Sequence, residues 1–98
     1  MKFLIIQKVK QEIPLEKWAK LLPLQFKYFN KLEKEKPLEV YYHLIGKQGS
    51  MLVVNVDSNE MLSKVIGEDP MVFHQEREVY PLTTHETHEK QIKRLLQP

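Results

Sequence analysis

His43 is the side chain in this sequence best suited to acid–base chemistry. It falls in a segment of alternating polarity, where Tyr41 and Ile45 share its face and Tyr42 points the other way. An imidazole titrates near neutral pH, so it can exchange a proton with an acidic C–H beside a carbonyl group. The alternative is a hydrogen-bonded histidine at a sheet surface or dimer interface. His43 is therefore the candidate catalytic residue, with Tyr41 as its companion.

Aromatic side chains in one long amphipathic segment offer a surface for a flat ligand. Phe26 and Phe29 fall on the apolar stripe of that segment, so we expect them in the hydrophobic core. Trp18 and Tyr28 are the better candidates for lining a substrate pocket. Trp18 lies just before Pro23, and a helix that kinks or breaks at a proline opens space at its boundary with a sheet.

Two further groups of polar residues look like metal sites at first sight. His74, Glu76 and Glu78 alternate along one strand face, but such carboxylates more often face solvent or pair with lysines. His85 and His88 are three residues apart, whereas the H-E-x-x-H motif places its histidines four apart. Cysteine is absent, which excludes thiolate ligands, thiolate nucleophiles and disulfides. The sequence predicts no metal site.

Hydrophobic periodicity defines the elements that must position these residues. Strands are expected at residues 3–9, 38–45, 51–56 and 72–82, and helices at residues 15–36, 58–66 and 84–96. Pro23 should kink or break the first helix, because it lacks the amide proton that bonds Ala19. The order predicts one α+β domain over residues 1–98, with a ferredoxin-like βαββαβ pattern, a four-stranded antiparallel sheet and a C-terminal helix.

One face of that sheet remains exposed in a single protomer. Two helices on one face leave the other open, yet the first and third strands are apolar on both faces. An exposed apolar face of that size indicates a partner. We therefore expect a homodimer in which two sheets lie face to face.

Composition excludes several other partners. The 15 basic residues are interspersed with 13 acidic ones, so no nucleic-acid footprint is evident. No segment approaches the roughly 20 apolar residues of a membrane span, and the N-terminal apolar run is shorter than that of a secretory signal. Together with the lack of cysteine, this favours a cytoplasmic protein without nucleic-acid or membrane partners.

The order of several short motifs resembles that of the muconolactone isomerase-like family of dimeric α/β-barrel proteins. These motifs are a hairpin glycine at Gly46, the strand-to-helix passage over residues 56–62, a loop opened by Pro70, and a strand that ends at Pro81 and Leu82. Two positions depart from the family pattern. The sequence has His43 where the resemblance leads us to expect arginine, and Met71-Val72-Phe73 where further proline and leucine are usual.

The resemblance implies a ferredoxin-like protomer, a dimer with opposed sheets that can assemble into a higher oligomer, and a small-molecule pocket between sheet and helices. It also implies an activity that moves a double bond within a lactone by proton abstraction and redelivery, without metal or organic cofactor. In this reading His43 exchanges the proton, and Trp18, Tyr28 and Tyr41 shape the pocket. Two alternatives stay open: a cofactor-free monooxygenase of the same fold, and a non-catalytic binding or assembly protein.

Overall fold

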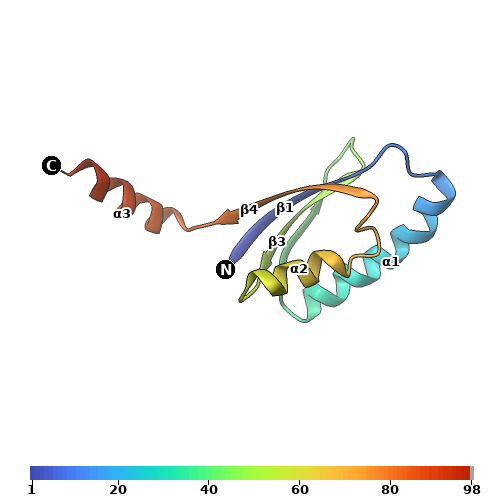
Figure 1. Ribbon diagram of the computed structural model, residues 1–98, viewed down its shortest axis with the longest axis horizontal. Helices are drawn as coiled ribbons and strands as arrows, with labels where there is room; N and C mark the ends of the chain where they lie inside the picture. Colours follow the sequence, from blue (N-terminus) through green and yellow to red (C-terminus); the bar gives the residue numbers. More distant parts are fainter. Residues whose placement is uncertain (98) are drawn as a thin grey trace.

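Two helices cover one face of a four-stranded antiparallel sheet, and a third helix stands away from both, as Figure 1 shows. The computed structural model describes residues 1–97. Its sheet has the strand order β2-β3-β1-β4. The elements are β1 (Lys2–Val9), α1 (Leu15–Lys34), β2 (Leu38–His43), β3 (Gly49–Asn55), α2 (Asn59–Gly67), β4 (Gln75–Leu82) and α3 (His85–Leu96). The predicted α+β, βαββαβ fold with an additional C-terminal helix is confirmed.

The hydrophobic core lies between the sheet and the two helices. In the register of the sheet, Ile5 on β1 faces Leu52 on β3, and both are 1% exposed. Phe29 of α1, 2% exposed, packs on them within a single cluster. The neighbouring pairs Leu4–Val53 and Ile6–Met51 point to the opposite face, which no helix covers (Figure 1). Strands β1 and β3 are therefore apolar on both faces, as the sequence indicates.

Helix α1 runs through Pro23 without a break. The predicted break there is wrong, and the alternative, a kink, stays a prediction. Ala19 and Pro23 are both exposed, so the Ala19 carbonyl that loses its helical partner faces water instead of an apolar interior. Phe29 lies in the core as predicted, whereas Phe26 is 39% exposed and lies at its edge.

Two boundaries near the candidate residues differ from the sequence prediction, and a third agrees with it. β2 ends at His43, so Ile45 belongs to the following turn, is fully exposed, and does not share a strand face with His43. β4 begins at Gln75, not at residue 72, because the preceding residues form turns closed by the amide of His74, which donates to the Met71 carbonyl at 2.9 Å. Helix α2 begins as its sequence predicts, and the Ser58 hydroxyl accepts from the Met61 amide at 3.1 Å.

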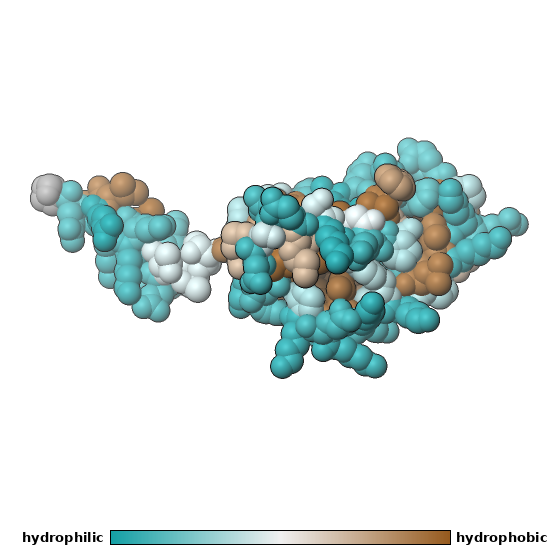
Figure 2. All heavy atoms as spheres, turned by 60° about the horizontal axis from the view of Figure 1, so that its bottom comes forward, coloured by the Kyte–Doolittle hydropathy of each residue, from teal (hydrophilic) through white to brown (hydrophobic). Residues whose placement is uncertain are grey.

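Helix α3 has no buried residue. Figures 1 and 2 show it as a separate lobe joined to the body by a narrow extended segment. Its own stabilisation is local: the Thr84 side chain caps its first turn, and ion pairs such as Lys93–Glu89, 2.7 Å, join successive turns. Within residues 1–97, no helix combines the length and the apolar character needed to cross a membrane.

Candidate functional site

A group of polar side chains is buried between α1 and the sheet, where apolar side chains are the rule. We call it the polar core cluster. Polar groups removed from water need hydrogen-bond partners, so such a cluster must be internally satisfied or bind something else. Its members come from β1, α1, β3, the loop after α2, and β4: Gln7, Gln25, Ser50, Asp69, Gln75 and Arg77.

An ion pair anchors this cluster. A guanidinium nitrogen of Arg77 lies 2.5 Å from a carboxylate oxygen of Asp69, and the two side chains are 10% and 1% exposed. The same nitrogen donates to Gln75 Oε1 at 3.0 Å. Asp69 also accepts from Gln25 Nε2, at 3.1 Å to each oxygen, and from the Met71 amide at 2.9 Å. The loop after α2 is thus tied to both α1 and β4.

A directed chain of hydrogen bonds leads from Arg77 toward the β2–β3 hairpin. Arg77 Nε donates to Gln7 Oε1 at 3.3 Å, and Gln7 Nε2 donates to Ser50 Oγ at 3.0 Å. Arginine has donors only, so it fixes the orientation of the Gln7 amide with its oxygen toward Arg77. The Gln7 amide nitrogen therefore faces Ser50, whose hydroxyl acts as the acceptor.

His43 lies directly across the sheet from Ser50 and on the helix-facing side. Its exposed ring packs at 4.8 Å from the Tyr41 ring and edge-on to Phe26 at 5.8 Å, measured between ring centroids. The Tyr41 hydroxyl is buried and has no hydrogen-bond partner within residues 1–97. Burial, with a smaller contribution from Asp69, raises the pKa of Tyr41 to about 12, so it remains a proton donor. We call Tyr41, His43 and Ser50, with Phe26 above them, the hairpin-end site.

Trp18 lies over the same end of the sheet. It lines a small cavity of about 200 Å³ together with Gln48 of the β2–β3 hairpin and Lys10 at the end of β1. Its indole nitrogen is buried, and in the described part of the chain no acceptor receives its proton. Trp18 and Tyr41 each contribute a buried donor that lacks a protein partner, the property expected of groups that meet a ligand or a buried water.

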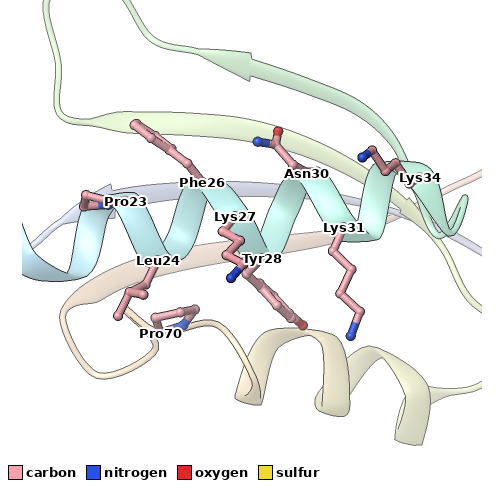
Figure 3. A pocket seen from close by; sticks show the side chains of 9 residues that line it. All are labelled: Pro23, Leu24, Phe26, Lys27, Tyr28, Asn30, Lys31, Lys34 and Pro70. Atoms are coloured by element: carbon pink, nitrogen blue, oxygen red, sulfur yellow. The ribbon is translucent and has the colours of Figure 1, made fainter.

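Tyr28 points away from His43. Figure 3 shows its side chain directed toward α2, and its hydroxyl donates to the Val65 carbonyl at 2.6 Å. Burial, followed by the charges of Glu68, Asp69 and Glu35, raises its pKa to about 12. Tyr28 lines an open groove of about 820 Å³ along α1, with Leu24 and Pro70 beside it (Figure 3). The structure therefore brings together Tyr41 and His43, sets Trp18 over the same hairpin, and separates Tyr28.

The polar core cluster was not predicted from the sequence, although two features of the sequence indicate it. Gln7 interrupts an apolar strand, and Gln25 falls on the apolar stripe of α1. Two acidic residues of β4, Glu76 and Glu78, lie opposite Lys8 and Ile6 on the open face of the sheet. Among residues 1–97, no three histidine, aspartate or glutamate side chains gather as metal ligands would.

Comparison with solved structures supports the fold assignment. The chain superposes on muconolactone isomerase with a TM-score of 0.79 and 22% sequence identity, over 87% of this chain and 91% of that one. It matches the 5-chloro-2-hydroxyhydroquinone dehydrochlorinase of Burkholderia phenoliruptrix AC1100, solved with 2,5-dihydroxybenzoquinone, with a TM-score of 0.72 at 17% identity, over 89% and 98% of the chains. An antibiotic biosynthesis monooxygenase gives 0.54 at 16%, over 86% and 98%.

Sequence comparison identifies the family. No curated protein matches the chain by sequence. The profile of the family described as muconolactone delta-isomerase matches residues 1–88, which is nearly the whole chain and includes every strand of the sheet. The chain therefore belongs to the muconolactone delta-isomerase family.

Proposed function

We propose that this protein binds a small unsaturated carbonyl compound at the hairpin-end site and isomerises it by proton transfer through His43. The observation that supports this most directly is the position of His43. It is exposed to solvent on the helix-facing side of the sheet, and it lies opposite Ser50 at the end of a buried polar chain. A base that can be reached from solvent thus sits beside fixed polar groups.

The reaction needs one proton and no net oxidation. The neutral imidazole of His43 takes a proton from the γ-carbon, at the far end of a C=C bond that is conjugated with the carbonyl group, and the electron pair of that C–H bond moves into a dienolate. The imidazolium then returns the proton to the carbon beside the carbonyl group, which shifts the double bond and regenerates neutral His43. Tyr41 and Trp18 shape the pocket around the reacting ring.

The relatives support a small oxygenated ring as the ligand class. One is an isomerase named for a lactone, and another was solved with a hydroxylated quinone. A second candidate function is a cofactor-free monooxygenase, favoured by the structural match to an antibiotic biosynthesis monooxygenase. The two candidates differ in oxygen consumption, because isomerisation consumes none.

The test is lactone isomerisation followed by ultraviolet absorbance, with muconolactone and simple analogues as substrates. We expect His43→Ala to lower the turnover rate by about 10²- to 10⁴-fold, the usual contribution of a general acid or base. His85→Ala is the matched control, since His85 is exposed on α3, away from the sheet. Turnover with oxygen uptake would favour the monooxygenase, and no turnover in the wild type would leave a binding or assembly role.

We also infer that the protein forms a homodimer through the open face of its sheet. That face carries Tyr42, 67% exposed, and Tyr80, 46% exposed, around the apolar side chains of β1 and β3. Burying apolar surface of this kind provides the driving force for association.

Light scattering at micromolar concentration tests the dimer. The wild type should give twice the mass of the chain, and Val53→Lys, which places a charge on the open face, should give a monomer. Gln11→Lys adds the same charge at an exposed site between β1 and α1 and should leave the dimer intact. A monomeric wild type would overturn the inference.

A further inference from the structure

The hairpin-end site has unused hydrogen-bond donors. Ser50 Oγ accepts from Gln7 Nε2, and within residues 1–97 no acceptor receives the hydroxyl proton of Ser50. Among the same residues, the Tyr41 hydroxyl is likewise buried without a partner, as is the Trp18 indole N–H in the neighbouring cavity beside Gln48. Each of these groups can donate a hydrogen bond, and the indole cannot accept one.

The acceptors of the polar core cluster, in contrast, are occupied. Both Asp69 oxygens receive hydrogen bonds, from Gln25, Arg77 and the Met71 amide. The side-chain oxygen of Gln7 receives Arg77 Nε. Gln75 Oε1 receives both Gln25 and Arg77. What the buried part of the site can still offer a ligand is therefore hydrogen-bond donation.

These free donors are uncharged groups. The buried cation of the polar core cluster, Arg77, is already neutralised by Asp69. Arg77 is paired with Asp69, and its remaining bonds go to Gln7, Gln75 and the Val72 carbonyl. The lysines at the end of β1 and in the β2–β3 turn, at positions 8, 10 and 47, are exposed at the surface. A carboxylate moved into this interior would lose its hydration without gaining a cation, which is costly.

From this balance we propose that the hairpin-end site is selective for an uncharged carbonyl oxygen, with Ser50 as its donor, and excludes carboxylates from its buried part. Ser50 is 4% exposed and lies about 5 Å from its cross-strand partner His43, the spacing of neighbouring strands. A molecule that reaches His43 from solvent therefore places an adjacent oxygen within reach of Ser50. The proposal rests on the proposed function, since it names the ligand class of the same site.

A matched pair of probes tests it by equilibrium binding. Phthalide is an uncharged aromatic lactone, and 2-(hydroxymethyl)benzoate is its ring-opened carboxylate with the same carbon skeleton. Binding is followed by calorimetry and by the fluorescence of Trp18, the single tryptophan of the chain. We expect phthalide to bind at least about tenfold more tightly than the carboxylate. This factor corresponds to the free energy of one hydrogen bond that the carboxylate does not form in the site.

Variants assign the effect to its residues. Ser50→Ala should weaken phthalide binding by about five- to tenfold, the worth of one neutral hydrogen bond, and Ser63→Ala, exposed on α2, should leave it unchanged. Because Ser50→Ala also leaves Gln7 Nε2 without its acceptor, Tyr41→Phe serves as a second variant whose hydroxyl has no partner to lose in the free protein.

Equal or tighter binding of the carboxylate, no binding of either probe, or phthalide binding that both Ser50→Ala and Tyr41→Phe leave unchanged would overturn the proposal. Failure of the proposed function looks different. In that case the wild type binds phthalide selectively but turns over no lactone, and His43→Ala changes nothing.

Discussion

The buried ion pair of Arg77 and Asp69 makes the folded state sensitive to substitution of either residue. Two opposite charges in a low-dielectric environment stabilise little in sum, but removing one partner leaves the other buried and uncompensated. The charges here are held by the Gln7 and Gln25 amides as well as by each other. A single substitution at this position therefore perturbs β1, α1 and β4 at once.

Asp69→Asn should lower the free energy of unfolding by about 3–5 kcal/mol, because it leaves the Arg77 charge buried without a counterion. Chemical denaturation at neutral pH measures the loss. Glu39→Gln is the matched control: Glu39 pairs with Lys2 at 3.2 Å, but the two side chains are 29% and 55% exposed. That change should cost at most about 1 kcal/mol. Equal losses in both variants would contradict this account.

Alkaline pH should destabilise the protein through Tyr28 and Tyr41. Both have a pKa of about 12 in the folded protein against 10.0 for an ordinary tyrosine, so the folded state holds their protons to higher pH than the unfolded chain does. Their contribution to stability is fully present below pH 10 and is lost as the pH rises toward 12. Replacing both tyrosines by phenylalanine should flatten the decline of unfolding free energy over this range, and an unchanged slope would exclude them as its cause.

At the residue scale, the sequence predicts that His43 and Tyr41 lie on the same face of a strand, because alternation along a strand fixes which side chains share a face. The polar core cluster could not be assembled in this way. Gln7 and Arg77 are 70 positions apart and meet only because β1 pairs with β4. Tyr28 shows the same limit, since its hydroxyl is directed by a contact with α2 that no spacing within α1 reveals.

Two glycines differ in what their elements require. A Cβ at Gly49, the first residue of β3, would lie 2.5 Å from the backbone oxygen of Gln7, so the strand pair must separate to admit it. At Gly67, the last residue of α2, a Cβ would meet nothing within 4 Å. The first glycine is required by sheet packing and the second is not.

Gly49→Ala should therefore lower the unfolding free energy by about 1–3 kcal/mol through overpacking. Gly67→Ala should raise it by about 0.5–1 kcal/mol, because alanine loses less backbone entropy in a helix. Thermal unfolding of the two variants beside the wild type gives both signs in one experiment. A stabilising Gly49→Ala would show that β1 and β3 can separate at the hairpin without cost.

Element types were predictable because apolar periodicity is set by burial, while element ends depend on local bonds that compete with it. The fourth strand illustrates this. Val72 and Phe73 favour strand by residue type, yet the amide of Val72 donates to the Asp69 carbonyl at 3.0 Å and closes a turn. The buried Asp69 fixes that turn, so the boundary is decided by the cluster and not by the strand.

At the scale of the whole molecule, α3 is the least supported element. Helices of about 12 residues are marginal in water on their own, and this one has no buried side chain. Its apolar residues Ile92, Leu95 and Leu96 remain exposed and gather on the separate lobe seen in Figure 2. In the proposed dimer, a second copy is the natural surface for them to pack on.

Hydrogen exchange at two protein concentrations tests this dependence. Amides of α3 should exchange rapidly in dilute solution and become protected at concentrations where the dimer forms, whereas amides of β1 should stay protected at both. Protection of α3 that does not change with concentration, together with a confirmed dimer, would show that this helix needs no second copy.

The fold of the protomer was predictable from the sequence, but the position of α3 was not. The apolar residues along one side of a helix do not indicate which surface that side packs against. The dimer itself stays a prediction. It follows from the apolar residues on both faces of β1 and β3, a property of the sequence that the structure shares.

The central place of β1 has a consequence for synthesis on the ribosome. β1 is synthesised before β3 and β4, yet it lies between them in the sheet. While the chain grows, the edge of β1 that will pair with β4 stays open for about 3–13 seconds, at the roughly 5–20 residues per second of translation. An open apolar strand edge invites pairing with another nascent chain.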